Sequence, residues 1–237
     1  ALCETTSRHT IAAKNSLEPG DIGGIEDIEK LPFMTNEDLN AAYPLGLLAV
    51  PRSEIVRIQA TSGTTGKPKI GAYTRRDIDI WAEGVARCMA MAGVTRDDTV
   101  IVSYGYGLFT GGLGAHYGAE KLGAMVIPVS TGNTAKLITM LIDFEATAIA
   151  CTPSYLLHIA ETLEKEGKID QIRLKCCICG AEPWTDAMRK QIEDRLHIRA
   201  FDIYGLTEVY GPGIGINCSY NTGMHYWDDF IYIEIRL

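Results

Sequence analysis

The sequence lacks any long uninterrupted apolar run. Charged residues, glycine or polar residues break every apolar stretch well before the roughly 18 residues that a membrane-spanning helix needs. The start, ALCETTSRHT, also lacks the apolar segment of a secretory signal peptide. Basic residues are in deficit, with 22 Lys and Arg against 30 Asp and Glu, which argues against a long polyanion such as DNA as the main partner. These absences predict a soluble, cytoplasmic protein that binds neither membranes nor nucleic acid.

A spaced disulfide framework is absent too. The seven cysteines are an odd number, and three of them crowd into the apolar run KCCIC. This clustering favours buried, reduced thiols at Cys176, Cys177 and Cys179. Internal repeats and low-complexity linkers are also missing, while a hydrophobic content of 46% is ample for a core. We therefore expect a globular protein.

From residue 54 onward the sequence alternates between short β-rich runs and amphipathic stretches. Such alternation is typical of an α/β fold whose parallel sheets are covered by helices. The last part, from residue 213, indicates a β-hairpin around the turn NTG. Helices are predicted over 134–144, 153–166 and 185–196. Residues 1–34 are irregular and Gly- and Pro-punctuated, so we expect an N-terminal appendage there and the main body over 35–237.

The stretch TSGTTGKPK, from Thr61 to Lys69, is the most informative loop. Glycines allow close approach of the backbone, so N–H groups and hydroxyls can turn toward an anion such as phosphate. A P-loop would need glycine at Thr61 and Ser or Thr at Pro68, and it has neither. The alternative is a solvated surface hairpin that binds no ligand, although simple turns rarely need so many hydroxyls.

The same nine residues resemble the phosphate-binding signature of the adenylate-forming superfamily, and YGLTE, from Tyr204 to Glu208, resembles its second signature. Further segments resemble the phenylacetate-CoA ligase family in particular; they are YPLGLLAVP, YGYGLFTGGLGAHYGAE, CTPSY, GAEPWT and HYWDD. The resemblance implies the N-terminal domain of that superfamily. It also implies two reaction steps: a carboxylate attacks the α-phosphorus of ATP to give acyl-AMP and pyrophosphate, and the thiol of coenzyme A then displaces AMP.

The resemblance also implies roles for single residues. Glu208 would bind Mg²⁺ through its hard carboxylate oxygens, Thr207 would donate to the α-phosphate, and Lys67 would be the counter-charge of the phosphates. Positions implied for ATP binding are Ser62, Gly63, Thr64, Thr65, Gly66, Lys67, Ala181, Glu182, Pro183, Asp202, Ile203, Tyr204, Gly205 and Thr207. Positions implied for the aromatic acid are Tyr104, Phe109, Gly180, Ala181, Gly205 and Pro212.

Two histidines need separate treatment. A carboxylate substrate is already ionised near neutral pH and needs no general base, so His116 is interpreted as structural or pocket-lining. Cys218 and His225 flank the predicted hairpin turn, and a thiolate with an imidazole is a zinc-competent pair. Relatives often carry a Cys-x-Cys further along, which would complete a structural zinc site.

Several alternatives stay open at this point. Superfamily members continue into a ribose-binding aspartate, a hinge and a C-terminal domain with a catalytic lysine, none of which is found here. We therefore expect a truncated chain without the C-terminal domain. The leading hypothesis is an AMP-forming ligase for phenylacetate that uses ATP, Mg²⁺ and coenzyme A, and the family suggests a homodimer. The alternatives are a ligase for another aromatic acid and a catalytically inactive nucleotide-binding interaction module.

Overall fold

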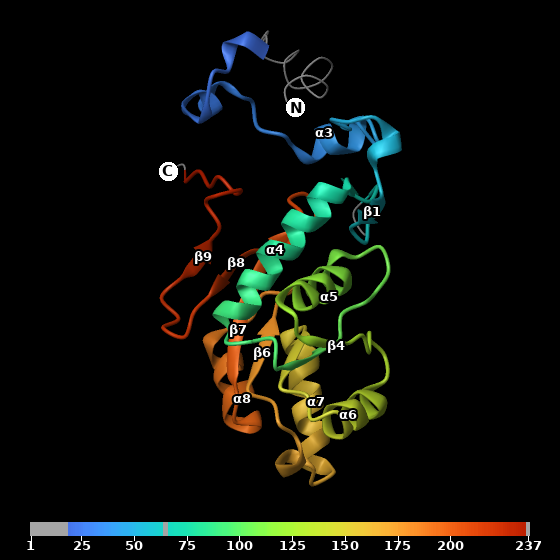
Figure 1. Ribbon diagram of the computed structural model, residues 1–237, viewed down its shortest axis with the longest axis vertical. Helices are drawn as coiled ribbons and strands as arrows, with labels where there is room; N and C mark the ends of the chain where they lie inside the picture. The colour runs from blue at the N-terminus through green and yellow to red at the C-terminus, as the bar shows by residue number, and fades with distance from the viewer. Residues whose placement is uncertain (1–18, 64–65, 236–237) are drawn as a thin grey trace. The chain divides into compact units, whose positions relative to one another are not determined.

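The structure of the chain is a computed structural model that describes residues 19–63 and 66–235. It divides into two compact units, with the boundary between Arg76 and Asp77 in the first turn of α4 (Figure 1). This boundary follows the loop at 61–69, whereas the predicted functional boundary lies at residue 34. Within the part of the chain that the structure describes, no helix is both long and apolar enough to cross a membrane.

The first unit is built from short elements. Thr35 caps α3 with a capping box, because its hydroxyl accepts from the backbone of Asp38 while the Asp38 carboxylate accepts from the Thr35 N–H. Strands β1 and β2 pair antiparallel, with Ala60 opposite Ile70, so residues 61–69 form their connection. The elements are η2 (Pro19–Asp21), η3 (Ile25–Lys30), α3 (Asn36–Ala41), η4 (Arg52–Glu54), β1 (Arg57–Ala60) and β2 (Ile70–Tyr73).

The second unit alternates strands and helices, as predicted. The helices expected over 134–144, 153–166 and 185–196 are α6, α7 and α8, with ends within one residue of the prediction. The elements are α4 (Arg75–Met91), β3 (Thr99–Val102), α5 (Thr110–Leu122), β4 (Met125–Ile127), α6 (Thr134–Asp143), β5 (Ala148–Cys151), α7 (Pro153–Lys165), η5 (Ile169–Gln171), β6 (Cys176–Cys179), α8 (Asp186–Leu196), β7 (Arg199–Leu206), β8 (Gly211–Asn217) and β9 (Met224–Tyr226).

These strands form one seven-stranded sheet in the order β4-β3-β5-β6-β7-β8-β9. The strands from β4 to β7 are parallel, and β7, β8 and β9 pair antiparallel. The chain passes from β3 to β4 on one side of it and then crosses to β5 on the other side, so the direction of strand addition reverses at β3. Ligand sites of open α/β sheets lie outside the carboxyl ends of strands at such a reversal. The predicted fold is therefore confirmed, with antiparallel pairing that already begins at β7.

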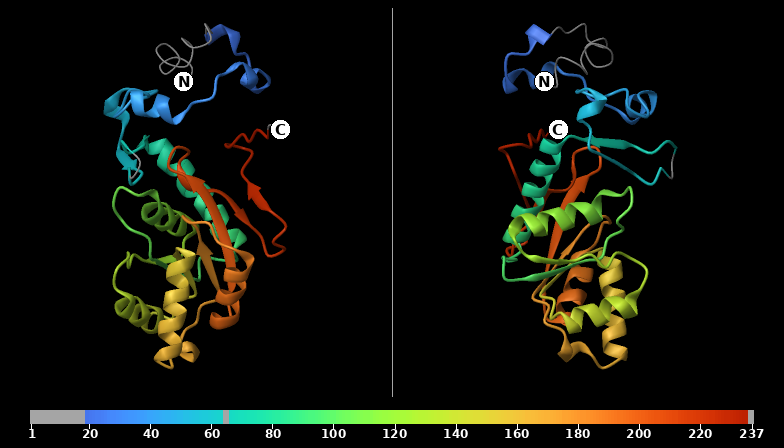
Figure 2. Two further views of the ribbon diagram at one scale, coloured as in Figure 1. Left: turned by 180° about the vertical axis from the view of Figure 1, so that it is seen from behind. Right: turned by 45° about the vertical axis from the view of Figure 1, so that its right-hand side comes forward.

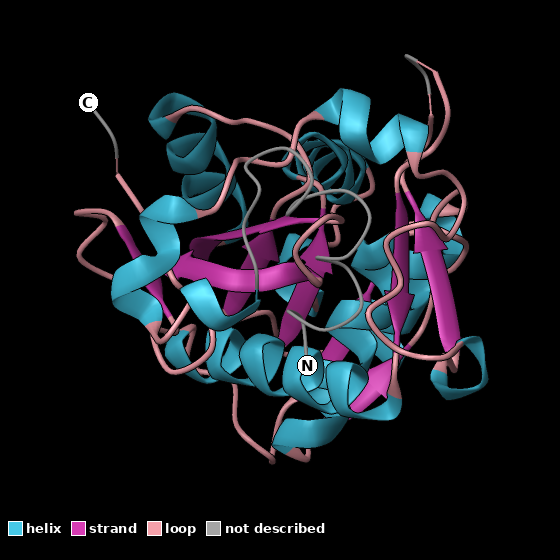
Figure 3. Cartoon of the chain, turned by 90° about the horizontal axis from the view of Figure 1, so that it is seen from above, coloured by secondary structure: helices cyan, strands magenta, loops and turns pink. Residues whose placement is uncertain are grey.

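Helices cover both faces of this sheet, as Figure 3 shows by secondary structure. Helices α6, α7 and α8 pack on one face around a core that includes Ile149, Cys177 and Cys179 (Figure 2). Helix α5 contacts β3, β4 and β8. The three crowded cysteines are buried and free, as predicted, and burial raises the pKa of the Cys176 thiol to about 12. Parallel strands covered on both sides need this continuous apolar character.

The last predicted strand is shorter than expected. The hairpin predicted from residue 213 onward has MHYWDDFIYIEIRL as its second arm, whereas β9 ends at Tyr226. The indole N–H of Trp227 donates to the Gly213 carbonyl at 2.8 Å, and Arg87 forms an ion pair with Asp229 at 2.8 Å. The backbone turns here, and the Ile231 N–H donates to the Trp227 carbonyl at 2.8 Å. Side-chain contacts to β8 and α4 thus take the place of strand pairing.

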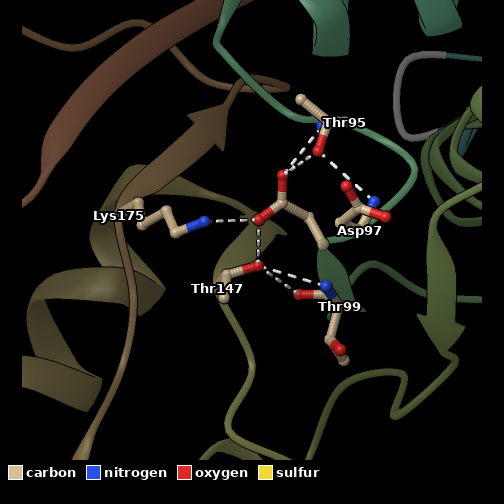
Figure 4. A network of polar contacts seen from close by, with 6 residues as sticks. Thr95, Asp97, Thr99, Thr147 and Lys175 are labelled. Carbon is tan, nitrogen blue, oxygen red and sulfur yellow. Dashed lines mark hydrogen bonds and ion pairs between the residues drawn. The ribbon is translucent and has the colours of Figure 1, made fainter.

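A buried carboxylate joins the amino ends of three adjacent strands (Figure 4). Asp98, only 4% exposed, precedes β3, and its carboxylate accepts from the Thr147 hydroxyl at 2.8 Å and from Lys175 Nζ at 2.9 Å. Thr147 precedes β5 and Lys175 precedes β6. The carboxylate also accepts from the Thr95 N–H at 2.8 Å. Burial alone would raise the pKa of Asp98, but the hydrogen bonds from these three residues outweigh it and lower that pKa to about 2.

Candidate functional site

The loop from Thr61 to Lys69 is closed at its neck by two hydrogen bonds. The Thr61 N–H donates to the Lys69 carbonyl at 3.0 Å, and the Lys69 N–H donates to the Thr61 hydroxyl at 2.9 Å. Gly63, with φ of 66°, requires the left-handed conformation that glycine adopts without strain. The Gly66 N–H donates to the Gly63 carbonyl at 3.1 Å. Thr64 and Thr65 lie outside the described residues.

The two lysines of this loop have different partners within the first unit. Lys69 Nζ donates to the Asn40 side chain at 2.5 Å and to the Asn36 carbonyl at 3.5 Å, which ties it to α3. Lys67 Nζ lies 5.2 Å from the centre of the Tyr43 ring. A cation–π contact of this exposed kind stabilises by only about 0.5–1 kcal/mol. Lys67 can therefore exchange this contact for an anion at small cost, whereas Lys69 would lose two hydrogen bonds.

Predicted site residues of the second unit lie at the carboxyl edge of its sheet. Tyr104 follows β3, the segment 180–183 follows β6, and Asp202 to Gly205 form the end of β7. Because β3, β5, β6 and β7 are parallel and adjacent, these positions come to one edge. The buried Asn217 of β8, which sequence reasoning missed, accepts from the Asp202 N–H at 2.7 Å. That hydrogen bond joins β7 to the antiparallel part of the sheet.

The YGLTE segment is part strand and part turn. Strand β7 runs through Leu206, so Tyr204 lies on the strand, and this residue is 41% exposed. Gly205 lies at a β-bulge, and a Cβ there would be 1.9 Å from the Gly211 carbonyl oxygen, so only glycine fits. Thr207 is buried and Glu208 is exposed in the turn that leads to β8. The structure thus presents the Glu208 carboxylate to solvent beside a fixed backbone turn.

The GAEPW turn after β6 is held by contacts to its neighbours. A Cβ on Gly180 would lie 2.5 Å from the Ile203 carbonyl oxygen, so glycine permits the close approach to β7. Ala181 has φ of 71°, a left-handed conformation that is uncommon for alanine. Glu182 accepts from the Ser154 N–H at 2.7 Å, in the first turn of α7. Its carboxylate therefore has a structural partner, and a direct contact of Glu182 with ATP remains a prediction.

Residues predicted to line the aromatic acid site are packed against one another. Tyr104 is buried, its hydroxyl donates to the Cys151 carbonyl at 2.7 Å, and burial raises its pKa well above the ordinary value. A Cβ on Gly111 would lie 2.6 Å from a Phe109 ring carbon and 3.2 Å from Tyr104 Cγ. The two rings therefore fill the space beside Gly111, whereas a Cβ on Gly105 or Gly107 would meet no atom within 4 Å.

The remaining predicted residue of that site, Pro212, is held by α4. Its carbonyl accepts from the Trp81 indole N–H at 2.7 Å. A cavity of about 10 Å³ beside it has room for roughly one water molecule, which is far too little for an aromatic acid. The residues that line it are Trp81, Gly84, Tyr210, Pro212, Gly213, Ile214, Phe230 and Ile231. This cavity is consequently a packing defect of the second unit.

The metal predictions rest on few side chains. Among the described residues, no group of three or more His, Cys, Asp or Glu side chains is placed to hold a metal ion. Mg²⁺ commonly takes only one or two protein carboxylates together with phosphates and water, so the exposed Glu208 alone fits that chemistry. His225 pairs with Ile216 across the β8–β9 hairpin, which puts Cys218 diagonal to it. Two ligands do not complete a tetrahedral zinc site, and zinc remains a prediction.

Comparison with known families decides the broader identity. The profile of the AMP-binding enzyme family matches residues 7–227. The chain belongs to the AMP-binding enzyme family. Within this family it is 50% identical over 226 residues to phenylacetate-coenzyme A ligase of Pseudomonas putida, covering 94% of this chain and 51% of that protein. It is also 50% identical over 222 residues to the ligase of the same name from Escherichia coli K12, covering 92% of this chain and 51% of that protein.

A solved structure supports the same assignment. The crystal structure of 2-hydroxyisobutyryl-CoA ligase with 2-HIB-AMP and CoA matches with a TM-score of 0.87 and 29% identity, over 96% of this chain and 52% of that one. The predicted superfamily and its N-terminal domain fold are therefore confirmed. This AMP-binding enzyme chain spans about half the length of the relatives it matches.

Proposed function

We propose that this chain supplies the ATP- and acid-binding part of an AMP-forming ligase. The enzyme would activate phenylacetate with ATP to the acyl-adenylate and then form the thioester with coenzyme A. The observation that carries the proposal is the 50% identity to the Pseudomonas putida ligase over 94% of this chain. Residues 35–237 would provide the binding functions, with 1–34 as an appendage. A homodimer and a cytoplasmic location are parts of the same proposal.

Catalysis at phosphorus depends mainly on positioned donors and charge, because negative charge spreads over phosphate oxygens in the transition state. Backbone N–H groups of the 62–67 loop and the ammonium of Lys67 would bind the β- and γ-phosphates. The exposed Glu208 would hold Mg²⁺, which supplies positive charge to the phosphate oxygens when bound. The buried Thr207 would donate to the α-phosphate, and the exposed ring of Tyr204 would stack on adenine.

The acid would bind beside the segment after β3 and the turn after β6. Its carboxylate is ionised near neutral pH and attacks directly, so this site needs no general base. Gly180, Ala181 and Gly205 would line this site next to Tyr104 and Phe109. Both rings lie close to Gly111, and the exposed Phe109 side chain can adjust to the acid more easily than the buried Tyr104 side chain.

Carboxylate-dependent exchange between ATP and pyrophosphate tests this proposal, since it isolates the adenylation step. We would measure it on the 237-residue chain and on the complete product of its gene, with phenylacetate and a panel of other aromatic acids. We expect exchange with phenylacetate by the complete product, lost without Mg²⁺ and strongly reduced by Glu208→Ala. A different preferred acid would correct the substrate. Tight ATP binding without exchange for any acid would instead support an inactive nucleotide-binding module.

A further inference from the structure

Polar contacts link three side chains beside the segment between β3 and α5. The Tyr106 hydroxyl lies 3.3 Å from His116 Nδ1, and His116 Nε2 lies 3.2 Å from a Glu120 carboxylate oxygen. The Tyr106 and His116 rings also meet edge to face, with centroids 5.8 Å apart. Residues 116 and 120 are one turn apart on α5, so they lie on one stripe of that helix.

Chemistry assigns the protons in these contacts. A carboxylate oxygen carries no proton to donate, so the Glu120 oxygen 3.2 Å from Nε2 favours the tautomer of a neutral His116 ring with its proton on Nε2. The other ring nitrogen, Nδ1, is then an acceptor for the Tyr106 hydroxyl. Burial, together with the Glu120 charge, raises the pKa of Tyr106, which keeps that hydroxyl protonated and able to donate. Both imidazole nitrogens thereby have a polar partner within 3.3 Å.

Tyr106 needs this anchor because its chain neighbours do not restrain it. Gly105 and Gly107 flank it, and a Cβ at either position would meet no atom within 4 Å. On the helix side, a Cβ on Gly112 would lie 2.4 Å from the Gly105 carbonyl oxygen, so the start of α5 contacts this backbone directly. Gly112, His116 and Glu120 thus form one stripe of α5 that supports Tyr106.

We infer that His116 is a positioning residue for the aromatic acid site, acting through Tyr106. The segment it supports carries Tyr104 at one end and Phe109 at the other, which are the two rings proposed to face the acid. The inference rests on the proposed function. It assigns His116 neither proton transfer nor contact with the acid; its effect is to hold Ser103 to Phe109 in the geometry that the acid meets.

Two substitutions at the same residue separate the two polar contacts of the imidazole. In His116→Asn the side-chain amide reaches the position of Nδ1 and can still accept from Tyr106. In His116→Gln it reaches the position of Nε2 and keeps only the contact with Glu120. We expect the KM for the acid in the exchange assay to stay within about 3-fold for Asn and to rise about 5- to 10-fold for Gln, as the loss of one hydrogen bond predicts. The KM for ATP should not change in either variant.

Tyr106→Phe gives an independent check, because it keeps the ring and removes only the hydroxyl. It should raise the KM for the acid as His116→Gln does, and the double variant should be no worse than either single one. Equal effects of Asn and Gln, additive effects of Gln and Phe, or a matching rise in the KM for ATP would overturn the inference.

The tautomer itself can be measured without any activity. In the ¹⁵N-histidine-labelled chain, the His116 signals, assigned by their loss in His116→Gln, should report a proton on Nε2 and an unprotonated Nδ1. A proton on Nδ1 would contradict the inference even if the enzyme is active. Conversely, the expected tautomer in a protein that performs no exchange would count against the proposed function and leave the Tyr106 anchor in place.

Discussion

Lys67 and Lys69 lie two positions apart in one loop, yet their side chains have different tasks. Lys69 binds two groups of α3, and its backbone closes the neck of the loop. Lys67 contacts only the face of an aromatic ring among the interactions described for it, at 5.2 Å. Since a phosphate binds an ammonium more strongly than an exposed ring does, Lys67 is the residue suited to bind ATP.

At this scale we expect Lys67→Ala to reduce phenylacetate-dependent exchange by roughly 100-fold, the order of magnitude for losing one charged donor to the transition state. Lys69→Ala is the matched control within the same loop. It should lower the melting temperature of the chain through loss of the α3 contact and reduce exchange far less. Equal losses of exchange in the two variants would show that the loop does not divide these tasks.

At the scale of elements, the GAEPW turn and helix α7 stabilise each other. Helix α7 begins after Thr152 without a side-chain cap from that residue. Its first turn is instead capped by Glu182 from the turn after β6. A carboxylate at a helix N-terminus satisfies a free N–H group and interacts favourably with the helix dipole. The bond from Ser154 also holds Glu182 in place directly after Ala181. The left-handed conformation of Ala181 needs such support from its surroundings.

Glu182→Ala should therefore destabilise the chain by about 1 kcal/mol, as the loss of a helix cap does. Glu182→Gln retains an oxygen that accepts from Ser154 but loses the charge, so its effect should be smaller. Urea unfolding followed by circular dichroism measures both. If Gln were as harmful as Ala, the charge and not the hydrogen bond would be the main contribution. If neither changed stability, the cap would be energetically unimportant.

In the sheet of the second unit, the carboxyl ends and the amino ends of the strands carry different groups. The carboxyl edge carries the predicted ligand-binding turns, while the amino edge carries the Asp98 network, which joins β3, β5 and β6 (Figure 4). Lys175 is largely exposed but its ammonium reaches the buried carboxylate, and that hydrogen bond raises the pKa of Lys175. The polar groups needed for stability are thereby kept away from the edge where the substrates are proposed to bind.

The pH dependence of this network follows from the lowered pKa of Asp98. Because its pKa falls from 3.8 to about 2 on folding, the carboxylate stabilises the chain by roughly 2 kcal/mol above pH 4, and this contribution is lost as the pH falls toward 2. Asp98→Asn should cost about that much at pH 7 and progressively less in acid. Urea unfolding at several pH values measures the difference. The adjacent, exposed Asp97→Asn is the control and should have little effect.

Much of the secondary structure and the family could be predicted from sequence. The ends of α6, α7 and α8 are encoded locally, by apolar spacing, caps and proline, and the strands by short apolar runs. The loop at Thr61 to Lys69 was found because its composition is unusual for a turn. It connects two antiparallel strands, and IGAY after Pro68 is a strand, where a P-loop would begin a helix.

Contacts between distant segments were decided only by the tertiary structure. No local pattern pairs Glu182 with α7, Tyr106 with His116, or Asp98 with Lys175, since each bond joins residues separated in sequence by 10 to 77 positions. The bulge at Gly205 likewise depends on the backbone of β8. Backbone preferences and apolar periodicity act over a few residues and are visible in one sequence. Strand order, and with it the choice of which polar groups meet, depends on the packing of the whole sheet.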